Sequence, residues 1–84
     1  MPPTLTRVAV QILAYLERQP NAKDTAEGIA QWWIHQPVDM VRHALALLTT
    51  LGFVTSTTLS GEVTVFEAAQ DKREEMRAWR RRFE

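Results

Sequence analysis

The chain of 84 residues contains no cysteine, and it has only 3 glycines and 2 histidines. Without cysteine there can be no disulfide bond, no thiolate nucleophile and no cysteine-based zinc site, so packing alone must hold the fold together. The glycines form no glycine-rich phosphate-binding loop. His35 and His43 are not spaced as a pair of metal ligands. We therefore expect neither a metal ion nor a cofactor.

Long apolar runs are also absent. No run approaches the ~18 residues that cross a bilayer, and the N-terminus lacks the charged start, apolar middle and cleavage site of a signal peptide. A composition of 45% hydrophobic and 24% charged residues is ordinary for a globular protein. We expect one small, soluble, cytoplasmic domain that buries roughly 60 to 65% of the surface its unfolded chain exposes.

The sequence offers no recognisable catalytic group. Ser56 and Ser60 lie in a predicted hairpin without a neighbouring base, and the carboxylates mostly occupy helix-cap or surface positions. Catalysis requires a nucleophile beside a base, or paired carboxylates in a pocket. We therefore expect no catalytic residues and a protein that is not an enzyme.

Positive charge is scarce in most of the chain, although the formal net charge is +0. Residues 1–70 carry more anions than cations, with a net charge of about −2, whereas residues 71–84 carry a net charge of about +2. The body of the protein is thus slightly acidic, and the positive charge lies in the C-terminal tail.

Two amphipathic helices are predicted in the first half of the chain. The first runs from Thr4 to Gln19 and ends at Pro20-Asn21, because the residue before a proline is pushed out of helical geometry. Asp24, with Glu27 three residues later, resembles a capping box and predicts a second helix from Thr25 to about Trp33. The apolar faces of these helices carry Leu5, Val8, Ala9, Ile12, Leu13, Tyr15 and Leu16, and then Ile29, Ala30 and Trp33.

A third helix has the strongest pattern. Pro37 suits its first turn, and Asp39 favours the positive end of the helix dipole. Gly52 supplies the left-handed residue that ends a helix, and Val54 follows at once in a segment typical of a strand. The core face of this helix carries Val38, Val41, Leu45 and Leu48.

The rest of the chain predicts a hairpin and a last helix. Residues 53–59 and 62–67 are rich in Val, Thr and Phe, and Ser60-Gly61 between them is a two-residue turn signal. Asp71 and Glu74 form another capping-box pattern, which opens a helix with an apolar face. That face carries Met76, Trp79 and Phe83.

This order of elements, with the pattern from Val41 through Gly52 to Val54, resembles the winged-helix superfamily, in particular small bacterial regulators of the MarR-like and ArsR-like kind. The resemblance covers about residues 5 to 68. It implies an α+β, mostly α fold: a three-helix bundle with a helix-turn-helix, a two-stranded β-hairpin wing and a C-terminal helix. Residues 1–70 are then the winged-helix domain, and residues 71–84 an amphipathic helix with a basic end.

One departure from the family lies between the second and third helices. The segment from Ala30 to Val41 is one residue longer than the family's usual turn and lacks its usual glycine. The sequence therefore leaves the angle of the third helix open.

The resemblance implies a DNA-binding transcriptional regulator, active as a homodimer, with the third helix in the major groove of double-stranded DNA. In that role the third helix and the wing tip contact DNA through Gln36, Asp39, Met40, Arg42, His43, Thr57, Thr58 and Ser60. Among these, Arg42 is the only full cation, and Asp39 is placed to neutralise it partly. Cations supply most of the non-specific affinity for DNA, and this surface has few of them. The alternative is therefore a winged helix that binds a protein partner without binding DNA.

The tail and the tryptophans each allow two interpretations. The tail arginines either contact phosphate or complement the helix dipole at the surface. The apolar face of the last helix either forms a dimer seam or folds back onto the first helix, and Trp32 is either an interaction site or covered by the last helix. The residues concerned are Arg77, Arg80, Arg81 and Arg82 for phosphate, and Trp32, Met76, Trp79 and Phe83 for interaction.

Overall fold

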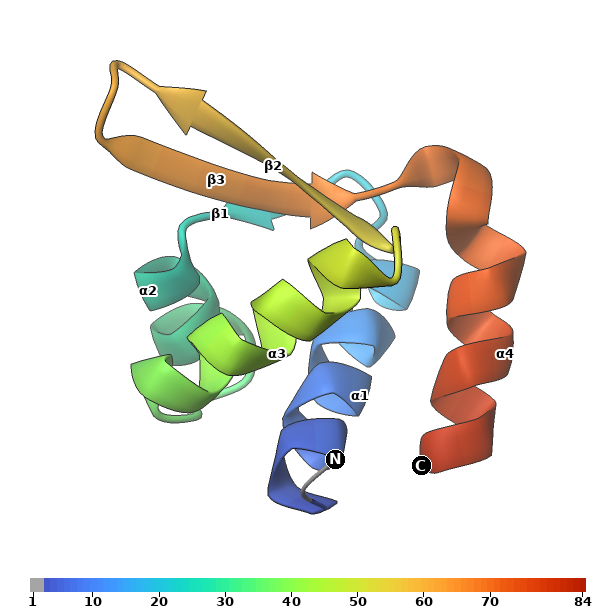
Figure 1. The fold of residues 1–84 in the computed structure, drawn as a ribbon. Coiled ribbons are helices and arrows are strands. Elements are labelled where there is room, and N and C mark those ends of the chain that lie inside the picture. The colour runs from blue at the N-terminus through green and yellow to red at the C-terminus, as the bar shows by residue number, and fades with distance from the viewer. Residues whose placement is uncertain (1–2) are drawn as a thin grey trace.

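The computed structural model of the protein describes residues 3–84, which form an α+β, mostly helical domain (Figure 1). Helices α1, α2 and α3 form a bundle, a small antiparallel sheet lies across one end of it, and α4 stands beside α1. The elements in chain order are α1 (Pro3–Arg18), β1 (Lys23–Asp24), α2 (Ala26–Gly28), the π-helical turn η1 (Ile29–Trp33), α3 (Val38–Thr50), β2 (Val54–Leu59), β3 (Val63–Ala68), the 3-10 turn η2 (Gln70–Lys72) and α4 (Arg73–Phe83). No helix in this part of the chain combines the length and apolarity needed to span a bilayer.

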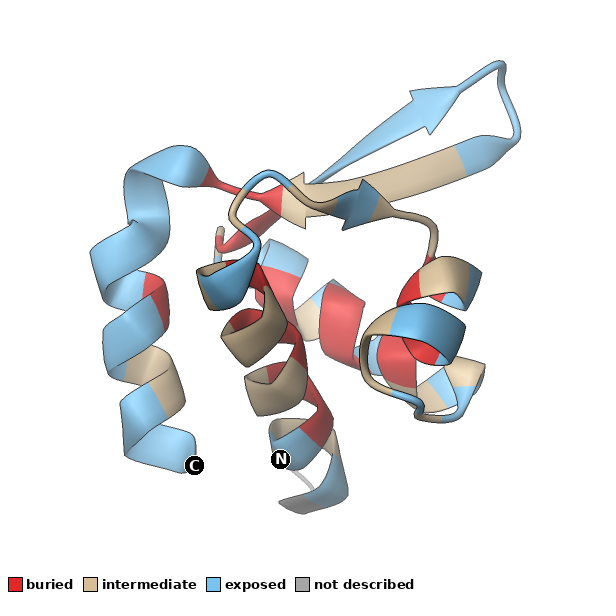
Figure 2. Ribbon diagram, turned by 180° about the vertical axis from the view of Figure 1, so that it is seen from behind, coloured by how far each residue is buried: buried red, intermediate tan, exposed pale blue. Residues whose placement is uncertain are grey.

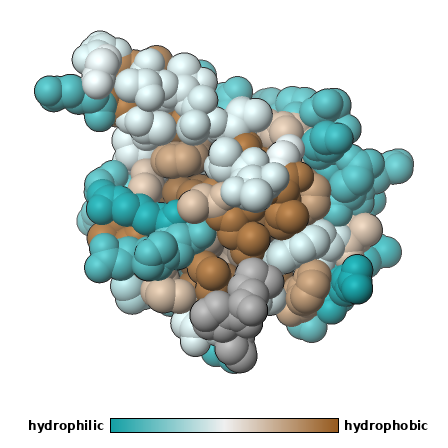
Figure 3. Space-filling model, in the orientation of Figure 1, coloured by the Kyte–Doolittle hydropathy of each residue, from teal (hydrophilic) through white to brown (hydrophobic). Residues whose placement is uncertain are grey.

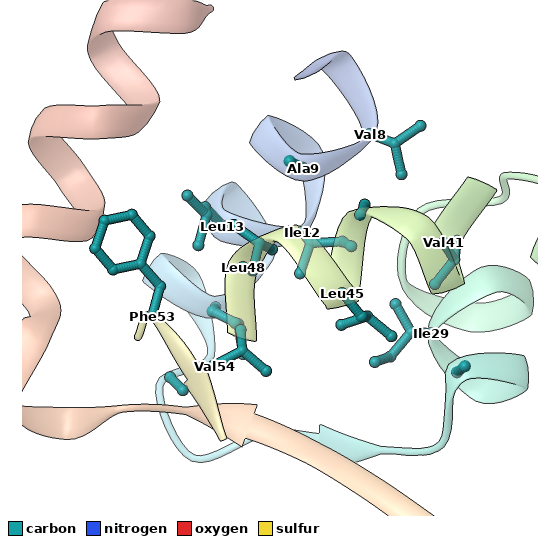
Figure 4. Close-up of a cluster of buried hydrophobic side chains, with 14 of the residues drawn as sticks. Val8, Ala9, Ile12, Leu13, Ile29, Val41, Leu45, Leu48, Phe53 and Val54 are labelled. Carbon is teal, nitrogen blue, oxygen red and sulfur yellow. The ribbon is translucent and has the colours of Figure 1, made fainter. Parts of the chain in front are cut away.

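The core lies between α1 and α3, where the predicted apolar faces meet (Figure 4). Ile12 and Leu48 are each 0% exposed, and Ile29 from η1 is equally buried beside them. The other labelled side chains of the cluster come from the start of β2 and from both helices, so one continuous core joins the bundle to the sheet. The sequence-based assignment of the core faces of α1 and α3 is confirmed.

Helix α3 ends where the sequence predicts. Gly52 has a φ of +81°, the left-handed conformation that only glycine adopts without strain. The amide of Phe53 donates to the carbonyl of Leu48 at 2.9 Å, which satisfies one of the open carbonyls at the helix end. The chain then enters β2 at Val54, which is 2% exposed.

The sheet has three strands in the order β1-β3-β2, so the predicted two-stranded sheet was wrong by one strand. The hairpin itself is confirmed, with β2 paired antiparallel to β3 from Val54↔Ala68 to Leu59↔Val63. The added strand β1 pairs Lys23 with Glu67 and Asp24 with Phe66. A strand of two residues has no alternation of apolar and polar positions to detect, which is why the sequence pattern missed it.

The second helix differs from its prediction. Thr25, not Asp24, is the N-cap, because its hydroxyl accepts a hydrogen bond from the Gly28 amide at 3.1 Å. Asp24 supports the cap from outside, since its carboxylate accepts from the Thr25 amide at 2.7 Å. The Glu27 carboxylate pairs with Arg42 on α3 instead of returning to the cap.

The segment before α3 contains an unusual turn. After only three α-helical residues the helix widens into the π-helical turn η1, in which the Ile34 amide donates to the Ile29 carbonyl at 3.3 Å. A π-helical turn holds one more residue than an α-helical turn. His35 then takes a φ of +53°, so a histidine occupies the left-handed position for which the sequence offers no glycine.

Helix α4 runs antiparallel to α1 and packs against it (Figure 1). The predicted capping box of Asp71 and Glu74 is wrong, because residues Gln70–Lys72 form a 3-10 turn and α4 begins at Arg73 without a side-chain cap. Only the face toward α1 is buried, whereas the opposite face is exposed over the length of the helix (Figure 2).

Candidate interaction surface

A hollow of about 690 Å³ separates the hairpin from α2 and α3. The hairpin contributes Ser56 and Phe66 from its strands and Glu62 from its turn, and α3 contributes Arg42 and Thr49. In Figure 3 the hairpin projects at the upper left as a largely pale arm, because threonine and serine dominate its surface. The structure therefore brings the exposed face of α3 and the hairpin together around one concave surface.

Arg42, the single cation predicted for this surface, is already paired. Its guanidinium contacts the Glu27 carboxylate, and the two side chains are 54% and 63% exposed. The pKa of Glu27 is lowered, first by a hydrogen bond from its own backbone amide and then by Arg42. Residues 43–71 contain no lysine or arginine, so neither the rest of α3 nor the hairpin adds positive charge.

The other predicted DNA-contacting residues are divided between the surface and the body. The Gln36 side chain donates to Gln11 of α1 at 3.0 Å, and Met40 packs against the core. The exposed ones on α3 and on the hairpin are Asp39, His43, Thr57, Thr58 and Ser60. The Thr58 hydroxyl lies 3.2 Å from that of Thr64, which ties the strands together near the tip.

The basic tail lies away from the hairpin tip, because α4 stands beside α1 on the other side of the molecule (Figure 1). Arg80 donates to Glu17 of α1 at 2.6 Å and to Glu84 at 2.5 Å, and Arg77 lies 3.4 Å from Glu17. The hydrogen bond from Arg80 lowers the pKa of Glu17, and the same contact raises the pKa of Arg80. Two of the tail arginines thus attach α4 to α1, whereas Arg81 and Arg82 are exposed.

The two neighbouring tryptophans point to different sides, as predicted. Trp33 is half-buried, and its ring stacks on Tyr15 of α1 with centroids 4.4 Å apart. Trp32 is 68% exposed, more than any other large hydrophobic residue among those described. Helix α4 does not cover it, since Trp79 packs edge-on against Phe53 at 6.4 Å instead.

The apolar face of α4 is largely used within the chain. Met76 is 6% exposed and belongs to the core cluster, so the prediction that it forms part of an interaction surface does not fit this structure. Trp79 is half-buried between Phe53 and Phe83. Only Phe83, which is 40% exposed, remains open at the end of the helix.

Sequence reasoning missed an apolar pair at the hairpin tip. Leu59 and Val63 face each other across the two strands, and they are 49% and 46% exposed. The alternation of side chains along β2 could have indicated this pair. Leu59 is five residues after the buried Val54, so it lies on the opposite, exposed face of the sheet. It also missed Glu17, whose contact with α4 bridges distant parts of the sequence.

The chain matches no protein-family model, and comparison with curated proteins and with solved structures returns no match either. Within residues 3–84, no cluster of three or more histidine, aspartate or glutamate side chains is arranged to hold a metal ion.

Proposed function

We propose that the chain is a winged-helix domain that binds a protein partner and not DNA. The order of elements supports the winged helix: α1, α2 and α3 are followed through Gly52 by the hairpin β2–β3, which takes the position of the wing. The short strand β1 and the 3-10 turn η2 were not among the elements predicted from the sequence.

The observation that carries the proposal is the charge of the surface around α3 and the wing. Phosphate contacts by lysine and arginine supply essentially all non-specific affinity for DNA. Arg42 is the only cation that lines the hollow beside the wing, and its charge is offset by Glu27. Glu62 adds a negative charge to the same hollow. This surface does not attract a polyanion.

Trp32 supplies a contact of the kind that protein interfaces use. Tryptophan is enriched among the residues that contribute most to binding free energy, because it buries a large area with few rotatable bonds. Its neighbour Trp33 is fixed by the stack on Tyr15, so the backbone that presents Trp32 is held in place. An exposed tryptophan on a well-anchored turn is an efficient anchor for a partner.

The experiment uses chemical cross-linking in the cells in which the protein occurs naturally. It compares the proteins captured by wild type, by Trp32→Ala and by Leu51→Ala. Leu51 is also exposed, at 39%, but it lies at the end of α3, so it controls for the loss of any surface apolar residue. A partner that is captured by wild type and Leu51→Ala, lost with Trp32→Ala, and bound again when purified supports the proposal. Equal capture by all three proteins contradicts the role of Trp32.

DNA binding is the second candidate, and one observation favours it. The Arg42–Glu27 pair is exposed, and water and salt screen exposed pairs, so a phosphate can compete with Glu27 for the arginine. Glu27→Gln removes the competing carboxylate. If the surface binds DNA, this variant is retained on duplex DNA more strongly than wild type at about 50 mM salt, and Arg42→Ala is not retained.

A further inference from the structure

The outer edge of β2 is not paired with any strand of its own chain. Strand β2 is last in the sheet order β1-β3-β2, and it is exposed along its length beyond Val54 (Figure 2). We propose that β2 pairs antiparallel with β2 of a second copy of this chain, so that two three-stranded sheets join into one.

The register shows which backbone groups are open for this pairing. The Ala69 amide donates to the Phe53 carbonyl at 2.9 Å, so Phe53 directs its carbonyl toward β3. Backbone groups alternate in direction along an antiparallel strand, so Thr55, Thr57 and Leu59 also face β3. Ser56 and Thr58 therefore direct their amides and carbonyls away from β3, toward the free edge.

This edge lacks the features that normally prevent strands from pairing. Native edge strands are protected by lysine, proline, a β-bulge or very short length. Strand β2 has the sequence VTSTTL over 6 residues, without a charge or a proline. Its register with β3 runs without interruption from Val54 to Leu59, so no bulge bends the edge away. The strand is a continuous template for another strand.

A second copy fits this edge better than a charged peptide. A two-fold axis at the middle of the strand places Thr57 opposite Thr57 of the other copy, and like charges placed opposite each other destabilise strand pairs. Strand β2 carries no charge, and the whole chain has a formal net charge of +0, so neither local nor long-range repulsion opposes the contact. The partly exposed Leu59 then packs beside threonines of the other copy, on the face opposite Val54.

This edge is separate from the proposed partner surface. Trp32 lies in η1, whereas the pairing edge lies in the hairpin, and α4 takes no part in the contact. The dimer is therefore tested without knowledge of the protein partner, and its failure leaves the role of Trp32 untouched.

Sedimentation velocity of the full chain from about 10 μM to about 1 mM tests the proposal. The high concentrations are needed because a single pair of strands forms a small interface, and interfaces below about 1,200 Å² are weak and transient. Wild type is expected to shift from 9.7 kDa toward twice that mass over this range. Ser56→Pro removes an outward amide without breaking a bond to β3, and it is expected to stay monomeric. Thr64→Pro is the matched control: it removes an outward amide from β3, beyond the end of β1, and should dimerise like wild type.

A charge exchange at Thr57 provides an independent readout if a proline variant fails to fold. Thr57→Lys and Thr57→Glu are each expected to be monomeric alone, because the two-fold places like charges together, and to form a heterodimer when mixed. Wild type that remains at 9.7 kDa at about 1 mM overturns the proposal. A dimer that survives in Ser56→Pro and in both unmixed Thr57 variants also overturns it.

Discussion

At the scale of single residues, His35 and Gly52 adopt the same left-handed backbone at opposite ends of α3. Gly52, with φ +81°, meets no atom within 4 Å of an added Cβ, so it is a glycine for its backbone conformation alone. His35, with φ +53°, is exposed and has a side chain that the conformation does not favour. The left-handed conformation of His35 redirects the backbone from the π-helical turn η1 into α3, and backbone strain at His35 is the cost of this change of direction.

Replacing His35 with glycine is expected to stabilise the fold by about 0.5–1 kcal/mol. The left-handed conformation costs a residue with a Cβ roughly 1–2 kcal/mol, and the extra freedom of glycine in the unfolded chain returns about half of that. Urea unfolding followed by circular dichroism measures the change. Gly52→Ala is the reverse control and is expected to destabilise the fold by about 1–2 kcal/mol. A loss of stability in His35→Gly would show that His35 is not strained.

At the scale of elements, the sequence predicts α1, α3 and the hairpin well, since each has a long apolar periodicity or a turn signal of its own. The short elements escape prediction for physical reasons. Strand β1 is stabilised by pairing with Glu67 and Phe66, which are far away in the chain. The turn η1 is too short to have a periodicity of its own, and Asp24 and Thr25 are neighbours that both suit a helix cap, so local propensity does not choose between them.

The candidate site was predictable in composition but not in pairing. The exposed positions of α3 and of the hairpin follow from helical and strand periodicity, and so does the division between Trp32 and Trp33. The partners Glu27 for Arg42 and Glu17 for Arg80 join elements that are distant in sequence. Such contacts require the packed structure, because no local spacing specifies them.

The cap of α2 gives a direct test at this scale. Thr25→Ala removes the hydroxyl that accepts from the Gly28 amide at 3.1 Å, and a lost N-cap costs about 1 kcal/mol. Thermal unfolding should show this loss, whereas Thr50→Ala, which removes only a hydroxyl bonded to a carbonyl within α3, should change stability less. Equal effects of the two variants would show that Thr25 is not the cap.

The attachment of α4 to α1 is expected to weaken in acid. The hydrogen bond from Arg80 lowers the folded-state pKa of Glu17 below its ordinary value of 4.5. The stabilisation is therefore present at pH values above 4.5 and is lost as pH falls through the lower, folded-state pKa. Because Glu17 is 32% exposed, the contribution is small, about 0.5–1 kcal/mol.

Glu17→Gln removes the titrating group, so the difference in unfolding free energy between wild type and this variant should shrink between pH 6 and pH 3, a range that spans the ordinary pKa of 4.5. Urea unfolding at several pH values measures it. A difference that is constant with pH would mean that Glu17 contributes through packing and not through its charge.

At the scale of the whole molecule, one core connects the bundle, the sheet and α4. A domain of 84 residues has a stability of roughly 4–13 kcal/mol, so the loss of one core side chain removes a large share of it. Leu48 is 0% exposed at the centre of this core. Leu48→Ala is expected to destabilise by about 2–5 kcal/mol in urea unfolding, against less than about 1 kcal/mol for the exposed Leu51→Ala.

The distribution of charge over the whole molecule leads to the central claim. The arginines of α4 lie beside α1, the hairpin has no cation, and Arg42 is paired with Glu27, so no continuous basic surface surrounds α3. The most direct measurement is a titration of the isotope-labelled wild-type protein with mixed-sequence duplex DNA at about 50 mM salt, followed by amide chemical shifts. No shift changes are expected at Arg42, His43 or the hairpin, because their surface lacks an unpaired cation. Saturable changes at these amides, abolished in Arg42→Ala, would contradict it and establish α3 as a DNA-contacting helix.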